Sequence, residues 1–212
     1  MSLPPKIVDQ YGRESFGGSQ MWLPDEMFVN SGCGIIAGLD AILRLKGEEN
    51  KGMTRDEYFS RFFDAKDYIR PIMIGRKREA RKIFGKEFFG SLGVSAGRFR
   101  RGIRTLAVKE GVKIKVKSFR FKWWEKIPEY LKSGDPLVML FVSPFRKICV
   151  VEPGGFKTMC DYHWVTITGL EGDTLRVSSW GEECKMSVQE LKRFGVILRF
   201  YSVSLENQTN LV

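Results

Sequence analysis

One stretch of this chain joins a reactive side chain to a strong helix signal, and it constrains the fold more than any other. Apolar residues recur at spacings of three and four from residue 35 to residue 43, a pattern typical of a helix with one face in the core. Cys33 stands at the start of this stretch, between Gly32 and Gly34. The sequence therefore predicts a cysteine in the first turn of a helix that is anchored in the core.

A cysteine in that position suits nucleophilic chemistry. Unpaired N–H groups and the positive end of the helix dipole favour the thiolate over the thiol there. We expect Gly32 and Gly34 to leave the sulfur open to a substrate, and the Cys33 N–H to donate to a developing oxyanion. Because a cysteine among small residues is often only a small buried hydrophobic residue, a second signal is needed.

The only histidine of the chain supplies it. His163 opens an alternating segment that ends near residue 170, and a turn and a second strand pattern follow at 174–181, which predicts a hairpin. Ser178 or Ser179, near the end of the second strand, can face His163 across the hairpin and orient its imidazole. Asp161, two residues before the histidine, is an alternative orienter.

These motifs resemble those of the papain-like cysteine peptidases. The family has its cysteine, histidine and asparagine in the order and context found here at Cys33, His163 and residues 178–181, which read Ser-Ser-Trp-Gly. The form of residues 33–37, Cys-Gly-Ile-Ile-Ala, is similar to the bacteriocin-leader peptidase branch. The resemblance implies Cys33 as nucleophile, His163 as base and Ser178 as orienter.

Two positions depart from the family pattern. Ser178 stands where the family has asparagine, and its hydroxyl is a shorter and weaker acceptor. The glutamine that the family uses at its oxyanion site falls near Met27, which cannot donate a hydrogen bond. Asn30 is the nearest amide donor, so the expected oxyanion site is Asn30 with the Cys33 N–H.

The remaining patterns predict an α+β, papain-like fold in a single domain of residues 1–212. A helical lobe (about 20–111) carries the nucleophile helix and packs against an antiparallel β-lobe (about 112–205), followed by a polar tail (206–212). The expected helices are 54–63, a basic helix at 76–84, 95–111, 123–131 and 187–194. Beyond the hairpin, the expected strands are 112–117, 136–142, 148–151 and 195–203, with a loop at 156–161 and a polar arm at 1–20.

Positive charge is concentrated in one segment. Residues 66–122 contain 18 lysines and arginines against 4 aspartates and glutamates, in a chain of net charge +10. A solvated face of amphipathic helices explains such a run, and so does a surface for an acidic partner or nucleic acid. No zinc-finger, RNA-recognition or KH signature accompanies the segment, so charge alone is weak evidence for nucleic acid.

Other classes of function find little support. The four cysteines are scattered and the single histidine offers no cluster, so neither a metal site nor any cofactor is expected. The longest apolar run, 137–142, is far too short for a membrane span, and we expect a cytoplasmic protein. A redox role for Cys33 with Cys160 or Cys184 is a third alternative.

The function predicted from the sequence is a cysteine peptidase or related thiol acyl-hydrolase that acts on a peptide, amide or thioester bond of a peptide or protein substrate. The alternative is a catalytically inactive papain-like module that binds an acidic partner or nucleic acid through residues 66–122.

Overall fold

The computed structural model describes residues 3–48, 51–74, 80–83, 86–119, 124–195 and 197–206. Its centre is an eight-stranded sheet in which every neighbouring pair is antiparallel. The strand order is β6 (Ile114–Phe119), β13 (Ile197–Leu205), β7 (Leu137–Val142), β10 (Tyr162–Glu171), β11 (Thr174–Ser179), β12 (Glu182–Ser187), β8 (Ile148–Val151) and β9 (Lys157–Cys160).

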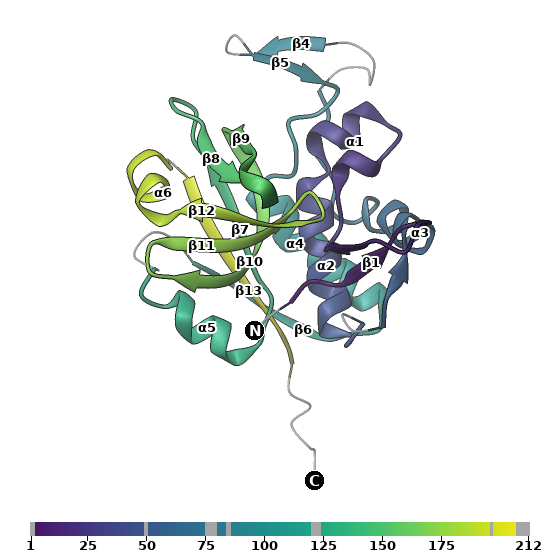
Figure 1. Ribbon diagram of the computed structural model, residues 1–212. Helices are drawn as coiled ribbons and strands as arrows, with labels where there is room; N and C mark the ends of the chain where they lie inside the picture. Colours follow the sequence, from purple (N-terminus) through teal and green to yellow (C-terminus); the bar gives the residue numbers. More distant parts are fainter. Residues whose placement is uncertain are drawn as a thin grey trace.

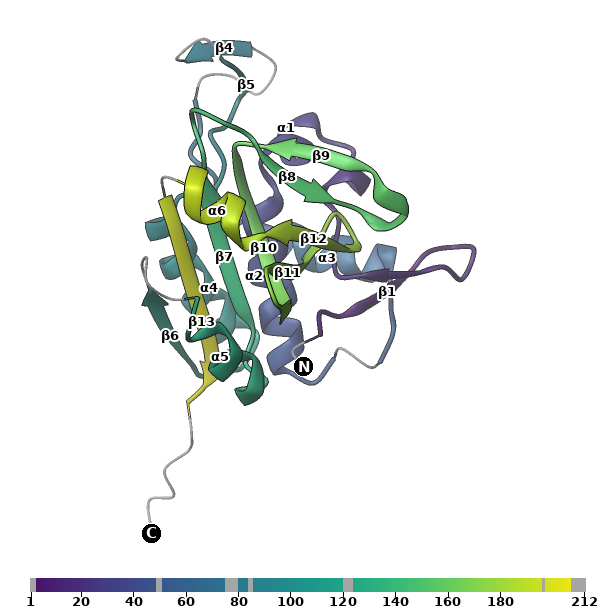
Figure 2. The same ribbon diagram turned by 60° about the vertical axis from the view of Figure 1, so that its left-hand side comes forward.

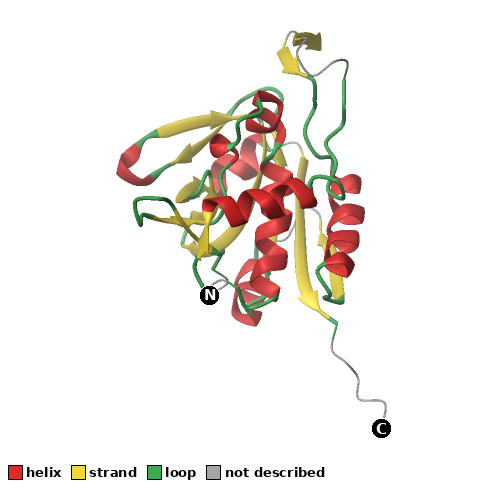
Figure 3. Cartoon of the chain, turned by 90° about the vertical axis from the view of Figure 1, so that its right-hand side faces the viewer, coloured by secondary structure: helices red, strands yellow, loops and turns green. Residues whose placement is uncertain are grey.

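Helices lie on both faces of this sheet (Figures 1 and 2). On one face a helical layer contains α1 (Glu26–Ser31), α2 (Cys33–Leu45), α3 (Arg55–Ala65) and α4 (Ala96–Lys109), and α5 (Ile127–Ser133) and α6 (Val188–Phe194) lie on the other. Figure 3 looks onto the helical layer. The α+β class, with the Cys33 helix packed against an antiparallel sheet, is confirmed.

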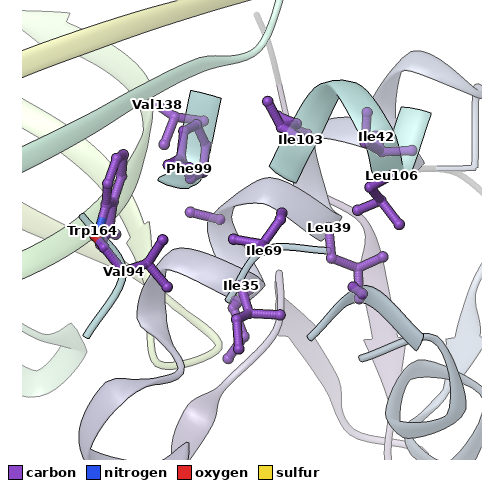
Figure 4. Packing of buried hydrophobic residues seen from close by; sticks show 14 of the residues in the cluster. Ile35, Leu39, Ile42, Ile69, Val94, Phe99, Ile103, Leu106, Val138 and Trp164 are labelled. Carbon is purple, nitrogen blue, oxygen red and sulfur yellow. The ribbon is translucent and has the colours of Figure 1, made fainter. Parts of the chain in front are cut away.

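Helix α2 is the centre of the helical layer because it is apolar almost all round. Its residues from Cys33 to Leu43 are all buried, as expected of a helix that packs on several neighbours at once. Gly38 allows one of these contacts, since a Cβ there would lie 2.3 Å from the Cδ1 of Ile69. Figure 4 shows Ile69 among Ile35, Leu39 and Phe99 in the core of this layer.

Local signals predicted several elements correctly. The capping box of Thr54 and Glu57 forms and opens α3, Ser95 caps α4 through the Arg98 N–H, and Ser187 caps α6. The predicted hairpin is present as β10 and β11. Each of these elements is specified by residues close together in the sequence.

Two expectations about local structure were wrong, and a third segment has more secondary structure than the sequence indicated. Within the predicted basic helix 76–84, residues Ala80–Ile83 form strand β4, which pairs with β5 (Lys86–Phe89), while 76–79 and 84 lie outside the described residues. The predicted loop 156–161 contains strand β9. The predicted arm 1–20 contains β1 (Lys6–Val8) and β2 (Glu14–Phe16), and β1 also pairs with β3 (Met53–Thr54). In each case a partner strand satisfies backbone groups that the local pattern left unassigned.

In the part of the chain that the structure describes, none of the helices combines the length and apolar character needed to cross a membrane.

Candidate active site

The joint between α1 and α2 fixes the position of Cys33. Asp25 caps α1 by accepting from the Met27 N–H at 2.9 Å, and Gly32 ends α1 and begins α2. A Cβ at Gly32 would lie 2.5 Å from the carbonyl oxygen of Phe28. Only glycine therefore fits where the chain passes from one helix directly into the next and delivers Cys33 to the first turn of α2.

The glycine after the cysteine serves packing, contrary to the expectation that it exposes the sulfur. A Cβ at Gly34 would lie 2.8 Å from the Cβ of Val94 and 3.0 Å from the Cδ1 of Trp164. Trp164 is itself fixed, because its indole N–H donates to the Val94 carbonyl oxygen at 2.8 Å and its ring stacks on Phe99. The start of α2 is thus pressed against β10, and Cys33 is only 6% exposed.

This burial reverses the expected ionisation of the thiol. Desolvation raises the pKa of Cys33 to about 11, although the backbone N–H groups of Trp164, Gly34 and Cys33 itself act in the opposite direction. The helix end and its N–H groups do favour the thiolate, but the loss of water outweighs them. In this structure Cys33 is a neutral thiol at neutral pH.

His163 is equally buried and is held from three directions. Its Nε2 lies 2.7 Å from the Ser179 Oγ, its ring stacks on Trp180 with centroids 4.7 Å apart, and the edge of Phe141 approaches it. Burial lowers the pKa of His163 to about 4. The imidazole is therefore neutral at pH 7, and the two candidate reacting groups are a neutral acid and a neutral base.

Trp180 has a strained backbone conformation. Among the described non-glycine residues, Trp180 is the one with a positive φ, at +54°. This left-handed backbone conformation costs a residue with a bulky side chain about 1 to 2 kcal/mol. This turn between β11 and β12 places the indole flat on the imidazole of His163. Trp180 belongs to the Ser-Ser-Trp-Gly motif at residues 178–181, but that motif does not predict a stacking role for its indole.

The register of β10 and β11 separates the two serine candidates. Thr166 pairs with Ser178, so Ser178 shares the sheet face of Thr166, whereas Ser179 shares the opposite face with His163. Ser178 instead donates from its Oγ to the Phe16 carbonyl oxygen at 2.7 Å. Of the two serines expected to orient the imidazole, the structure brings Ser179 to it and uses Ser178 to hold the N-terminal segment.

Cys33 and His163 line one small cavity together with Gln20, Asp40 and both serines. Its volume is about 10 Å³, which is close to the space needed by one water molecule. The sulfur accepts from backbone N–H groups, and the partner of the imidazole is Ser179. Cys33, His163 and Ser179 thus share this lining, but side chains alternate along β10, so the imidazole points to the sheet face opposite that of Trp164 and α2. A reaction between the thiol and the imidazole, and the entry of a substrate carbonyl, both require a local opening.

Gln20 is the amide that the sequence analysis missed. It is buried in the 3-10 helix Gln20–Trp22, lines the cavity of Cys33, and donates from Nε2 to the Val29 carbonyl oxygen at 2.7 Å. The expected donor, Asn30, lies exposed on α1 and donates within that helix to the Glu26 carbonyl oxygen. Gln20 is 13 residues before Cys33 in the sequence, so the spacing used to search for an amide did not reach it.

Asp40 is a second unexpected member. It lies on α2, is 2% exposed, and accepts from the Tyr58 hydroxyl at 2.7 Å and the Gly18 N–H at 3.1 Å. Burial raises the pKa of Asp40 to about 7, against the effect of these two hydrogen bonds. Through Gly18, Asp40 holds the segment that carries Gln20 against the Cys33 helix.

The other candidates lie elsewhere. Asp161 precedes β10, where its carbonyl oxygen accepts from the Ser143 N–H, and it is not among the described residues that line the cavity. All four cysteines fall within the described ranges as free thiols. Over those same ranges, no group of three or more His, Cys, Asp and Glu side chains is arranged to hold a metal ion.

The chain was compared with protein families, curated proteins and solved structures. No protein-family model matches the chain, and no curated protein matches it. The chain is similar to a crystal structure of a "putative C39-like peptidase" from Bacillus anthracis, with 13% sequence identity and a TM-score of 0.46. The similarity covers 81% of this chain and 88% of that one.

Proposed function

We propose that this chain is a papain-like cysteine peptidase or a related thiol acyl-hydrolase. The observation that carries the proposal is the shared cavity of Cys33 and His163, with Ser179 at hydrogen-bond distance from the imidazole. The helical lobe, about 20–111, supplies the thiol, and the β-rich lobe, about 112–205, supplies the base. The bacteriocin-leader branch is proposed on the form of residues 33–37 alone.

The proposed reaction starts from a neutral Cys33 thiol and a neutral His163 imidazole. When Nε2 of His163 donates to the Ser179 Oγ, Nδ1 is the basic nitrogen. Once a local opening at the start of β10 brings the imidazole to the sulfur and admits a substrate carbonyl, Nδ1 takes the proton of the Cys33 thiol while the sulfur bonds to the carbonyl carbon. The imidazolium then gives that proton to the leaving amine or thiolate, and an acyl thioester remains on Cys33.

Water completes the cycle. His163 takes a proton from the attacking water, the carbon–sulfur bond breaks, and the carboxylic acid leaves as the proton returns to the Cys33 sulfur. The developing oxyanion is held by the Cys33 N–H and by the second amide hydrogen of Gln20, which its bond to Val29 leaves available. Each good donor of this kind lowers the activation free energy by roughly 3 kcal/mol.

The test is to trap the thioester. The protein is incubated with activated esters and thioesters of short peptides, quenched in acid and analysed by peptide mass spectrometry. We expect the acyl mass on Cys33, and its loss in Cys33→Ala, whereas Cys149→Ala, which removes a more exposed thiol, is the matched control and should acylate normally. Acylation of Cys149 in preference to Cys33 would show that only surface thiols react.

A second candidate is a papain-like module without turnover. The observation in its favour is that burial keeps both reacting groups neutral, with the pKa of Cys33 raised and that of His163 lowered. In that case no acyl donor labels Cys33 at a rate above that of an ordinary thiol, and iodoacetamide modifies Cys33 more slowly than Cys149 both in the wild type and in His163→Ala.

A further inference from the structure

A second and much larger cavity lies on the helical layer. It has a volume of about 830 Å³ and is bounded by α1, by the segment after α3, and by the first turns of α4. Met27 and Phe28, both almost fully buried, form part of its apolar wall. Among the described residues its lining shares no member with the small cavity at Cys33, so the two are separate sites.

Four cations surround this cavity, and a single carboxylate joins them. The cations are Lys66, Arg70, Arg98 and Arg101, and the carboxylate is Asp67. Their charges leave the mouth strongly positive in a volume that suits a ligand of several residues or groups. A cavity of this charge fits a ligand with more than one negative group.

Among the described residues the three arginines have no carboxylate partner, whereas Lys66 pairs with Asp67. Arg98 donates from Nη1 to the Pro71 carbonyl oxygen and Arg70 from Nε to the Asp67 carbonyl oxygen, each leaving other guanidinium N–H groups for a ligand. Lys66 meets the exposed Asp67 carboxylate at 3.2 Å. Within the described part of the chain, no hydrogen bond or ion pair engages the Arg101 side chain.

One wall of the cavity is closely packed. Helix α4 packs directly on the segment after α3, since a Cβ at Gly102 would lie 2.5 Å from the Tyr68 carbonyl oxygen and 2.7 Å from the Ile69 Cα. Ile69 is fully buried against Gly38 of α2, and Figure 4 shows its side chain within the core of the helical layer. The site is thus preformed, which lowers the entropic cost of binding.

We propose that this basic cavity binds an acidic peptide segment in which carboxylates flank an apolar side chain. The carboxylates meet the four cations, where arginine offers bidentate geometry, and the apolar side chain packs on Met73, the exposed apolar residue of the lining. Single-stranded nucleic acid fits less well because successive bases need several exposed aromatic faces, and of the described aromatic lining residues Phe28 is buried and Tyr68 is half-buried. The proposal concerns binding and holds whether or not Cys33 is catalytic.

The test uses fluorescence anisotropy on full-length Cys33→Ala protein, which removes turnover. The probe is a labelled decapeptide with four glutamates around a central leucine, and the comparison probe has glutamines in place of the glutamates. We expect Arg70→Glu with Arg101→Glu to weaken binding of the acidic probe by about tenfold or more. Both side chains are exposed, and a thermal melt checks that the variant folds; Arg101→Gln alone provides a milder second variant.

Arg100→Glu with Arg104→Glu is the matched control. It makes the same change in the net charge of the protein, but neither residue lines the cavity, so binding should change less than about twofold. Equal weakening in the two double variants would overturn the proposal in favour of a general charge effect. Tighter binding of a single-stranded oligonucleotide, with the same dependence on Arg70 and Arg101, would overturn it in favour of nucleic acid.

Discussion

The small cavity beside Cys33 and the basic cavity beside α4 differ in the charge of their side chains: the first holds its titratable groups neutral, and the second keeps its cations charged. In the first, burial holds a thiol, an imidazole and a carboxyl close to their neutral forms by raising the pKa of Cys33 and Asp40 and lowering that of His163. In the second, exposed guanidinium groups remain in contact with water and keep their charge. Reactivity in the first therefore depends on a proton moved during the reaction, and recognition in the second depends on charge already present.

The largest effect should come from removing the base. We expect His163→Ala to lower the rate of Cys33 acylation by about 10² to 10⁴, the range for loss of a general base, because the thiol at rest is un-ionised. In the wild type the acid limb of the rate profile should fall near pH 4, where His163 becomes protonated. Stopped-flow acylation across pH measures both. An acid limb near pH 6.5 would break the comparison, since it would mean that water reaches His163.

The sequence predicted the fold best where one segment carries its own signal. The helix that starts at Cys33, the capping box at Thr54 and the hairpin after His163 all formed as predicted. Strands β4 and β9 were missed because each is defined by pairing with a neighbour, and not by a strong pattern of its own. The same holds for β2, whose Phe16 N–H donates to the Gly181 carbonyl oxygen at 2.7 Å, far along the chain.

The candidate site shows a similar division. Residue types at Cys33 and His163 could be read from local motifs, and their roles remain predictions. The choice between Ser178 and Ser179 could not, because a shift of one residue moves a side chain to the other face of the strand. The burial of Cys33 also could not be predicted from the neighbouring residues. Its place at a helix end predicted a lowered pKa, but the close packing of Gly34 against Val94 and Trp164 excludes water and raises the pKa of Cys33.

The next largest effect should be on the pH dependence of the free energy of unfolding, to which Asp40 and His163 contribute with opposite sign. From about pH 4 to pH 7 the folded state binds more protons at Asp40 than the unfolded chain, so the free energy of unfolding falls as pH rises, by on the order of 4 kcal/mol. From about pH 4 to pH 6.5 the unfolded chain binds more protons at His163, so the free energy of unfolding rises, by on the order of 3 kcal/mol. The two contributions largely cancel in the wild type.

Single substitutions should uncover each contribution. Urea unfolding of Asp40→Asn should show stability that rises from pH 4 to pH 6.5, and His163→Gln should show stability that falls from pH 4 to pH 7. Asp64→Asn, which changes an exposed carboxyl on α3, is the control and should follow the wild type. If all four proteins have parallel pH profiles, the small cavity does not hold these groups neutral.

The tight wall of the small cavity gives a third prediction. Gly34→Ala should lower the free energy of unfolding by about 1 to 3 kcal/mol, because its Cβ meets Val94 and Trp164 in a packed core. The matched control is Gly97→Ala on α4, next to the basic cavity, where a Cβ has nothing within 4 Å, and helix propensity should there add up to about 1 kcal/mol. Chemical denaturation measures both, and a neutral Gly34→Ala would show that the wall can move.

Substitution of Ser179 should affect the rate of acylation, whereas substitution of Ser178 should affect stability. Ser179→Ala removes the partner of the imidazole and should slow Cys33 acylation by about tenfold, the equivalent of one hydrogen bond near 1.4 kcal/mol. Ser178→Ala leaves the Phe16 carbonyl oxygen without that donor and should cost about 1 kcal/mol of stability, with acylation nearly unchanged. The reverse assignment of effects, with Ser178→Ala the slower enzyme, would restore Ser178 as the orienter.

The smallest effect is expected at the basic cavity. Arg70→Glu and Arg101→Glu should each change the free energy of unfolding by no more than about 0.5 kcal/mol, because both side chains are exposed and their cations are solvated in the folded and unfolded states alike. Thermal melts in low and moderate salt measure this. A loss of 2 kcal/mol or more in either variant would mean that the guanidinium is part of the fold, and the contrast between a buried neutral cavity and an open charged one would no longer hold.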